Sequence, residues 1–270
     1  MPTLYIVATP IGNLEDISLR AIKTLREVKL IAAEDTRKTK RLLNAYDIKT
    51  PVTSYYEHNK KSKLDYIIKQ LEEGDVALVS EAGTPAISDP GYELVVAASQ
   101  QGIAVVPIPG PSAVIASLAI SGLPTDRFIY IGFLPRKTGD RRRLLESVTD
   151  EPGTIIALET PHRLQAALDD IMFVLGDRRI AVCRQLTKLH EEVFRGRVSR
   201  AQAYFTQPKG EFTLVIEGKK DKEKPRLTED VLQKLKCLKE SGKKAREAVT
   251  QIVQETGLAR KEIYRAWLEL

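Results

Sequence analysis

The sequence predicts an α/β protein with two α/β domains and a small helical extension at the C-terminus. Short apolar runs alternate with amphipathic stretches in the first half, and a similar pattern resumes after the turn-rich break at residues 122–126. A charged stretch without apolar periodicity, residues 219–225, then precedes a helical tail. We therefore expect an N-terminal α/β domain at residues 1–122, a second α/β domain at residues 123–218, and a basic linker and helical tail at residues 219–270. A chain of 270 residues can build two hydrophobic cores.

The first domain should contain a parallel sheet with helical crossovers. Its apolar runs have the length of buried strands, and the stretches between them repeat apolar residues at helical spacing. The expected strands are residues 4–8, 30–33, 76–80 and 103–108, and the expected helices are residues 17–28, 36–45, 63–73, 90–101 and 111–120. Regular alternation of strand and helix is typical of parallel sheets, because parallel strands need a crossover connection.

The second domain should be α/β as well, with strands that need not all be parallel. Its expected strands are residues 128–133, 154–158, 180–185, 192–195 and 212–217, and a basic helix is expected around residues 141–148. Thr160 is a plausible N-cap for a further helix, with Pro161 at its first position and Gly176 at its end.

The tail should form a pair of helices at residues 243–268. Its apolar residues line two helical faces, Ala245, Ala248, Val249, Ile252 and Val253 on the first and Ile263, Tyr264, Trp267 and Leu268 on the second, with a turn at Thr256-Gly257. Residues 219–270 hold 14 Lys and Arg and 9 Asp and Glu, so they carry +5 of the net charge of +6. This asymmetry indicates an anionic partner, nucleic acid first and a membrane surface second; the alternative is a solvated, Lys-rich helical surface.

Composition excludes several classes of protein. With 43% hydrophobic and 29% charged residues, the chain is neither disordered nor fibrous. Its longest apolar stretches, such as residues 112–120, are far shorter than the roughly 20 residues that cross a bilayer. The N-terminus also lacks a basic segment leading into an apolar core. We therefore expect a soluble, cytoplasmic protein without membrane attachment.

Neither cysteine nor histidine is arranged for metal binding. Cys183 lies in an apolar run and should be a buried, inert thiol, and together with Cys237 it cannot build a disulfide framework or a zinc site. His58, His162 and His190 show no ligand spacing. We expect no metal.

Three loops rich in glycine and proline follow strands of the first domain, at residues 9–13, 81–91 and 109–113. Parallel strands place such loops on one edge of the sheet, where open α/β folds bind ligands. No G-x-G-x-x-G follows the first strand and no G-x-x-x-x-G-K-[ST] occurs, so the usual phosphate cradles of dinucleotides and nucleoside triphosphates are missing. The loops suit a small amphoteric molecule recognised by main-chain groups and an apolar pocket.

Several long motifs, in order, resemble the tetrapyrrole methylase superfamily, the class III S-adenosylmethionine-dependent methyltransferases. They are L-Y-I-V-A-T-P-I-G-N-L at residues 4–14, A-E-D-T-R at 33–37, S-E-A-G-T-P-A-I-S-D-P-G at 80–91 and P-G-P-S-A at 109–113. With E-T-P-H-R at 159–163 and R-Q-L-T-K at 184–188, they resemble the ribosomal RNA small subunit methyltransferase I family. The resemblance covers residues 3–218, and the helical tail also fits it.

The resemblance implies a tetrapyrrole-methylase-like fold with the cofactor cleft between two α/β domains. It implies S-adenosyl-L-methionine as cofactor and 2′-O-methylation of a cytidine ribose in 16S ribosomal RNA near the decoding centre. The implied partners are the small-subunit RNA, in the assembled 30S particle, and a second copy of the chain in a homodimer. The implied cofactor-binding residues are Pro10, Gly12 and Asn13 in the first loop, Gly83, Thr84, Ile87, Ser88 and Asp89 in the second, Ser112 and Ala113 in the third, and Leu158, Glu159, Phe212 and Thr213 in the second domain.

Methyl transfer to a hydroxyl needs alignment of the reacting atoms and a group that removes the hydroxyl proton. Glu34, Asp35 and Glu81 lie at predicted strand ends and are candidates for this base, with a capping or ion-pair role as the alternative for each. Arg37 could pair with an RNA phosphate or with Asp35. The candidates for RNA contacts in the tail are Lys243, Lys244, Arg246, Arg260, Lys261 and Arg265.

Two other functions remain open from the sequence. A small-molecule methylase acting on a tetrapyrrole would share the fold, but a basic tail has no evident use with such a substrate. A non-catalytic RNA-binding protein would keep the tail, but it would have little reason to retain Gly83, Asp89 and Ser112 together.

Overall fold

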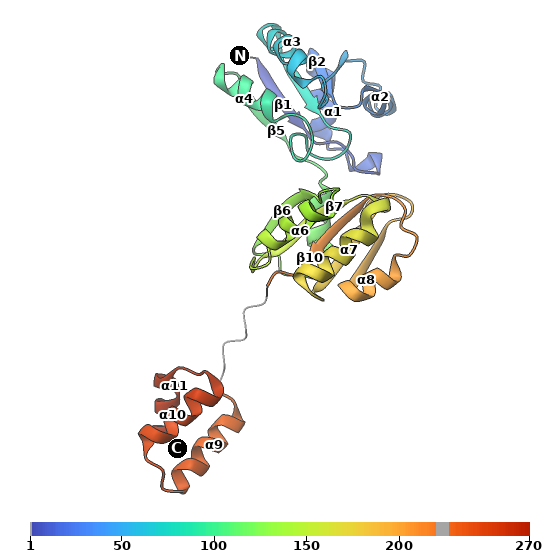
Figure 1. The fold of residues 1–270 in the computed structure, drawn as a ribbon. Coiled ribbons are helices and arrows are strands. Elements are labelled where there is room, and N and C mark those ends of the chain that lie inside the picture. Colours follow the sequence, from blue (N-terminus) through green and yellow to red (C-terminus); the bar gives the residue numbers. More distant parts are fainter. Residues whose placement is uncertain (1, 220–226) are drawn as a thin grey trace. The chain divides into compact units, whose positions relative to one another are not determined.

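The structure is a computed structural model that describes residues 2–219 and 227–270 (Figure 1). The chain divides into two compact units, Met1–Gly218 and Lys219–Leu270. Two five-stranded sheets lie in the first unit. Most of the predicted linker, residues 219–225, lies outside the described residues, and the boundary predicted at residue 122 falls inside the first unit, where it stays a prediction.

The first sheet is parallel throughout, with strand order β3-β2-β4-β1-β5. Its strands are β1 (Thr3–Val7), β2 (Leu30–Ala33), β3 (Val52–Ser54), β4 (Val76–Val79) and β5 (Ala104–Ile108). β2 and β4 are buried along their whole length, which is why their sequences are continuous apolar runs. The parallel sheet is therefore as predicted, apart from β3, whose three residues are too short to form a recognisable run.

Helices cover both faces of this sheet. They are α1 (Leu19–Glu27), α2 (Thr36–Ala45), α3 (Lys60–Glu73) and α4 (Tyr92–Gln100). Leu25 of α1 and Leu42 of α2 belong to one core, and Ile67 of α3 and Leu94 of α4 belong to the core on the other face. Consequently α2 and α3 lie on opposite faces of the sheet.

The second sheet is mixed, with strand order β6-β7-β10-β8-β9. Its strands are β6 (Phe128–Phe133), β7 (Thr154–Glu159), β8 (Arg179–Arg184), β9 (Glu192–Arg197) and β10 (Phe212–Ile216). β6 and β7 are parallel, and the other pairs are antiparallel. The register shifts between Tyr130 and Phe133, where Gly132 adopts a φ of +70°. This irregularity bends the end of β6.

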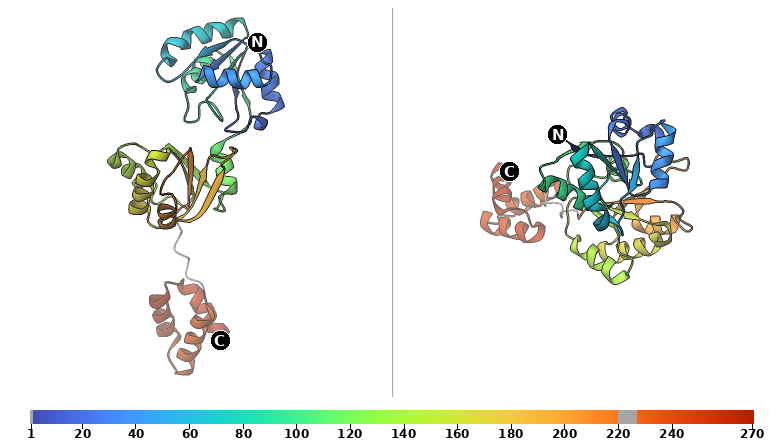
Figure 2. Two further views of the ribbon diagram at one scale, coloured as in Figure 1. Left: turned by 90° about the vertical axis from the view of Figure 1, so that its right-hand side faces the viewer. Right: turned by 90° about the horizontal axis from the view of Figure 1, so that it is seen from above.

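Helices from both halves of the unit enclose the second sheet. One face is covered by α6 (Thr138–Ser147), α7 (Pro161–Leu175) and α8 (Val198–Tyr204), of which α8 was not predicted. The other face carries α5 (Ala113–Ile120), whose Leu118 packs with Ile156 and Val215. The left view of Figure 2 shows this sheet between the yellow-green helices and the green helix α5. α5 therefore connects the third glycine- and proline-rich loop directly to the second sheet.

The C-terminal unit is a bundle of three helices rather than the predicted pair. Its helices are α9 (Glu229–Glu240), α10 (Ala245–Thr256) and α11 (Arg260–Glu269). Leu235 of α9 is buried with Ile252 and Trp267, so α9 completes the core that the two predicted helices could not close alone. Gly257, in the left-handed conformation, ends α10 at the predicted turn.

Candidate functional site

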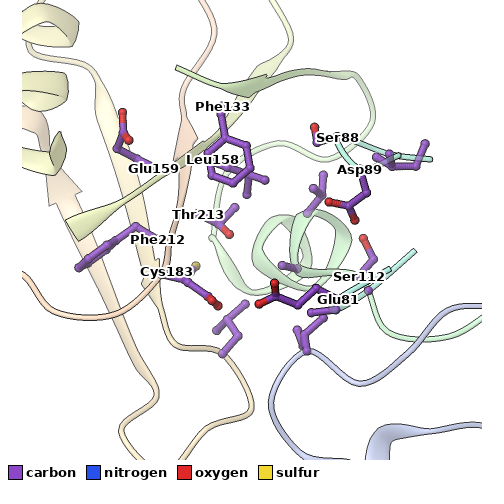
Figure 3. Close-up of a pocket in the computed structure, with 18 of the residues that line it drawn as sticks. Glu81, Ser88, Asp89, Ser112, Phe133, Leu158, Glu159, Cys183, Phe212 and Thr213 are labelled. Carbon is purple, nitrogen blue, oxygen red and sulfur yellow. The ribbon is translucent and has the colours of Figure 1, made fainter. Parts of the chain in front are cut away.

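A cavity of about 480 Å³ lies between the carboxyl edge of the first sheet and one end of the second sheet (Figure 3). The first sheet contributes the ends of β2 and the loops after β4 and β5. The second sheet contributes the ends of β6, β7 and β8 and the start of β10. Its size is within the range of about 300–1,000 Å³ that is typical of small-molecule sites.

The loop after β4, residues 81–91, forms one wall of the cavity. Gly83 is joined to Thr9 by two main-chain hydrogen bonds of 2.9 Å, which hold the loop against the first loop. Gly83, Ala86 and Ser88 have φ values of +82°, +67° and +63°. For the two residues other than glycine this left-handed conformation costs about 1–3 kcal/mol each, and such strain gathers at functional sites.

A second strained loop, which follows β8, also borders the cavity. Gln185 and Thr187 also have positive φ, at +46° and +66°, and Gln185 lines the cavity. In the described part of the chain the only other non-glycine residue with positive φ is Asp47. The strained backbone is thus concentrated in the two loops beside the cavity.

The strands of the second sheet present alternate side chains to the cavity. Leu158, Thr213 and Cys183 are aligned across β7, β10 and β8 and point toward the cavity in Figure 3. Glu159 and Phe212 point away from it, because neighbouring residues of a strand face opposite sides. Phe212 packs in the core under α7 and α8. These two residues therefore reach the cavity edge mainly with their main chain.

Glu159 has a structural role at the start of α7. Its Oε1 accepts hydrogen bonds from the main-chain N–H of Thr160, at 2.7 Å, and pairs with Arg163 at 2.7 Å. The partial positive charge at the N-terminus of the helix also stabilises a carboxylate at this position. Glu159 lines the cavity, but its Oε1 is engaged at the start of α7.

Asp89 is a carboxylate in the cavity wall with an altered acidity. Burial and the neighbouring charge of Glu34 raise the pKa of Asp89 to about 7, while a hydrogen bond with Ser80 opposes this shift. The adjacent Ser88 hydroxyl lies 2.6 Å from the Tyr130 hydroxyl of β6, which links the loop to the second sheet. Asp89 is therefore placed to gain or lose a proton near neutral pH.

The three carboxylates predicted as candidate bases have different positions. Glu34 lines the cavity and accepts a hydrogen bond of 3.0 Å from the main-chain N–H of Glu81. Burial, followed by the charge of Asp35, raises the pKa of Glu34, and Lys38 counteracts this. Glu81 also lines the cavity, and its carboxylate pairs with Lys38.

Asp35 does not line the cavity. It is the N-cap of α2, and its carboxylate accepts hydrogen bonds from the main-chain N–H groups of Lys38 and Arg37, at 3.2 and 2.8 Å. These two bonds lower the pKa of Asp35. Asp35 thus has the capping role that the sequence left open as an alternative to catalysis.

The structure brings together eleven of the fourteen predicted cofactor-binding residues. Those that line the cavity are Gly83, Thr84, Ile87, Ser88, Asp89, Ser112, Ala113, Leu158, Glu159, Phe212 and Thr213. Ser112 is also the N-cap of α5, where its hydroxyl accepts from the N–H of Ile115 at 3.4 Å.

Pro10, Gly12 and Asn13 were predicted for the same site, but they do not line the cavity, and Ile11 does so in their place. The main-chain N–H of Asn13 donates to the Thr187 hydroxyl at 3.0 Å. A Cβ atom at Gly12 would lie 2.6 Å from that hydroxyl, so only glycine lets the two loops approach this closely. The first loop therefore packs against the loop after β8, and its Ile11 lines the cavity.

Other lining residues were not predicted. They are Ile11, Ala82, Val114, Tyr130, Phe133, Thr160, Pro161, Cys183, Gln185, Leu186 and Glu211. The sequence gives only weak signals that these residues line a cavity. Cys183 is buried, as its apolar run predicts, and Phe133 lies at the end of a strand beside Gly132.

The predicted RNA-contacting residues are mostly exposed. Arg37, near the N-terminus of α2, is 90% exposed and lies 3.8 Å from Asp35. Of the tail residues, Lys244, Arg246, Arg260, Lys261 and Arg265 are exposed, whereas Lys243 is half-buried and donates to Gln251 at 2.6 Å. Arg265 pairs with Glu269 on the same helix. Both α2 and the C-terminal unit thus present cations to solvent.

Neither a membrane span nor a metal cluster is found within residues 2–219 and 227–270. No helix there is long and apolar enough to cross a bilayer. No three His, Cys, Asp or Glu side chains in these residues are grouped so that they could hold a metal ion. Both cysteines are free, Cys183 buried and Cys237 exposed.

Comparison with known proteins identifies strong similarities. The family described as tetrapyrrole (corrin/porphyrin) methylases matches residues 3–202. Proteins named ribosomal RNA small subunit methyltransferase I are 48% identical in Halalkalibacterium halodurans, over 98% of this chain and 94% of the relative, and 48% identical in Synechocystis, over 100% and 99%. The protein of that name from Bacillus subtilis is 42% identical over 99% of this chain and 94% of its own length.

Solved structures show the same fold at low sequence identity. A uroporphyrin-III-C-methyltransferase from Thermus thermophilus is similar with a TM-score of 0.59 and 17% identity, over 80% of this chain and 94% of that chain. A diphthine synthase gives a TM-score of 0.60 and 16% identity, over 80% and 90%. These similarities confirm the predicted fold class, and at this identity they bear on the fold alone.

Proposed function

The chain belongs to the tetrapyrrole methylase family, and on this premise we propose that it is an S-adenosylmethionine-dependent methyltransferase of small-subunit ribosomal RNA. Its target in this proposal is the ribose 2′-hydroxyl of a cytidine near the decoding centre. The observation that carries the proposal is the identity of 48%, over 98% of the chain, with a relative named for methylation of this RNA. Such a match extends over every element that contributes to the cavity.

The residues of the cavity fit S-adenosylmethionine in size and in chemistry. Within the described residues, the main-chain N–H groups of Thr84, Ser88 and Ala113 have no acceptor, so they are free to bind a carboxylate or ribose oxygen. Leu158 and Ile87 offer apolar contact for a ring. Glu34 and Asp89 supply negative charge that favours a cationic ligand. S-adenosylmethionine, when bound, supplies a methyl group already activated on a sulfonium.

The task of the chain's own residues is then alignment and proton removal. Holding two reacting atoms about 3–3.5 Å apart can contribute about 7–11 kcal/mol to the lowering of a barrier. Asp89 and Glu34 are the carboxylates in the wall with raised pKa values, and a base whose pKa lies near the working pH is the most effective. We therefore assign proton removal from the 2′-hydroxyl to this pair, in place of Asp35.

The RNA partner is supported by the charge of the C-terminal unit and by the names of the relatives. We propose that Lys244, Arg246, Arg260, Lys261 and Arg265 contact phosphates of the ribosomal RNA. Work on ribosomal RNA in the 30S particle also implies that the protein acts in the cytoplasm.

A homodimer is part of the proposal and rests on the family resemblance. Light scattering at working concentration should give twice the chain mass of 30.2 kDa. A mass of one chain would remove the homodimer without affecting the proposed reaction.

The proposed function is tested by offering three substrates in parallel with radiolabelled S-adenosylmethionine. They are purified small ribosomal subunits, naked small-subunit ribosomal RNA and a tetrapyrrole. Label in either RNA sample supports the proposal, and the comparison of the two shows whether the assembled particle is needed. Label in the tetrapyrrole alone would make the protein a small-molecule methylase. RNA binding without any transfer would make it a non-catalytic RNA-binding protein.

A further inference from the structure

The exposed face of α2 carries a dense group of cations. Its ten residues, Thr36–Ala45, include Arg37, Lys38, Lys40 and Arg41 and no Asp or Glu. All four cationic residues are exposed, while Thr39, Leu42 and Leu43 anchor the opposite side of the helix in the core. Helical spacing puts Arg37, Lys40 and Arg41 on one stripe, which we call the α2 cationic face, with Lys38 at its flank.

The charges of this face are only partly neutralised inside the protein. Lys38 pairs with Glu81, and Arg37 lies 3.8 Å from Asp35, whose carboxylate is already occupied as a helix cap. The side chains of Lys40 and Arg41 have no ion pair or hydrogen bond with any residue that the structure describes. These cations are available to an anion from solution.

The α2 cationic face is continuous with the cavity. Lys38 and Arg41 line a second, smaller hollow of about 120 Å³, together with Pro10 and Leu14. Glu81 lines both the hollow and the cavity. The residue that precedes the N-cap of α2 is Glu34, which also lines the cavity. An extended polyanion with one unit in the cavity would therefore have its neighbouring units close to α2.

We propose that the α2 cationic face binds the phosphodiester backbone of the RNA strand next to the target ribose and guides it into the cavity. This inference rests on the proposed function, and it adds Lys40 and Arg41 and the hollow beside them to the RNA-binding surface. Charge complementarity favours a nucleic acid strand, because contacts with phosphates supply most of the sequence-independent affinity for RNA. A membrane is disfavoured, since α2 itself has no exposed large apolar side chain and Leu14 in the hollow is a single one, too little to anchor the protein in lipid.

The face also differs from the C-terminal unit in what it can do. α2 is packed in the same compact unit as the cavity, so its cations have a fixed position relative to Glu34 and Glu81. Contacts on α2 can therefore position the strand, whereas contacts with a separate unit need only hold the RNA near the protein. Loss of the α2 contacts should raise the KM for RNA and leave the KM for S-adenosylmethionine unchanged.

The test compares the full-length double variant Lys40→Gln/Arg41→Gln with the control Lys61→Gln/Lys69→Gln. The control removes two exposed lysines from α3, on the opposite face of the first sheet. Binding to small-subunit ribosomal RNA and to purified small subunits is measured between about 50 and 200 mM salt. Calorimetry with S-adenosylmethionine and thermal unfolding show whether the cavity and the fold are intact.

For the α2 variant we expect RNA affinity about tenfold weaker at low salt and a log–log salt slope smaller by about 1.4, because each lost phosphate contact removes about 0.7. The control should keep the affinity and slope of the unchanged protein. Equal affinity and slope for both variants, in a protein that methylates ribosomal RNA, would overturn this inference alone. An unchanged protein that neither binds nor methylates ribosomal RNA would overturn the proposed function and this inference with it.

Discussion

Replacing Asp89 with Asn should stabilise the protein at alkaline pH and have little effect in acid. Burial and the charge of Glu34 raise the pKa of Asp89 from 3.8 to about 7. Between these values the folded protein keeps a proton that the unfolded chain has released. The stability that Asp89 contributes is therefore complete below about pH 4 and is lost as the pH rises through 7. Asn carries no charge at any pH and avoids this loss.

The size of the effect follows from the shift. About three pKa units, at about 1.4 kcal/mol per unit, give an upper limit of about 4 kcal/mol. Solvent reaches the Asp89 carboxylate at the cavity wall and screens its charge, which reduces the effect. We expect the Asn variant to be about 1–2 kcal/mol more stable than the unchanged protein at pH 8, with the difference vanishing near pH 4.

Urea unfolding at about pH 4, 6 and 8 measures this difference directly. Asp126→Asn is the matched control, because Asp126 is exposed and lies outside the cavity. This control removes a carboxylate from the surface without changing the cavity. The reasoning is refuted if Asp89→Asn is no more stable than the unchanged protein at pH 8, or if its advantage grows toward acid.

Three further changes test other parts of the structure. Gly83→Leu should abolish binding of S-adenosylmethionine, for which we expect micromolar affinity, about −8 kcal/mol at 1 μM. The control for backbone strain is Gly102→Leu, because Gly102 has a φ of +70° and a Cβ there would meet no atom within 4 Å. Unchanged calorimetric affinity in folded Gly83→Leu would contradict the site. Asp170→Ala should destabilise the protein by about 3–5 kcal/mol, because the buried Arg141 would lose the carboxylate that accepts from its Nε at 2.6 Å. A loss of stability below about 1 kcal/mol in urea unfolding would count against this. Deleting residues 219–270 should preserve cofactor binding and weaken RNA binding. The slope of log affinity against log salt concentration should become smaller by about 0.7–0.9 for each lost phosphate contact. Undiminished RNA affinity with the same slope would show that the tail is only structural.

The elements that could be predicted are those whose apolar residues follow one clear pattern without interruption. The apolar runs of β2 and β4 are buried on both faces, and such short continuous runs are typical of buried parallel strands. α9 was missed although Val231, Leu232, Leu235 and Leu238 have helical spacing, because the surrounding Lys and Glu residues dominate the pattern. β3 exists only through its pairing with β2, a tertiary contact that three residues cannot encode.

The site was predictable to the level of loops and not of side chains. Glycine, proline and the end of a parallel strand located the cavity wall at Gly83 and Ser112. In the first loop, Ile11 lines the cavity, whereas Asn13 donates its main-chain N–H to Thr187, which is 174 positions away in the chain. Local sequence carries no information about such a contact. The capping role of Asp35 was visible in the sequence only as one of two alternatives.

The central claim is that methyl groups are transferred to a ribose oxygen of small-subunit RNA. Its most direct test is to incubate small ribosomal subunits with the protein and methyl-labelled S-adenosylmethionine, digest the RNA to nucleosides and identify the labelled product by mass spectrometry. We predict a single labelled nucleoside, 2′-O-methylcytidine, that is absent when Gly83→Leu replaces the unchanged protein. Label on a base, on another nucleoside, or only on a tetrapyrrole offered in the same assay would contradict the claim.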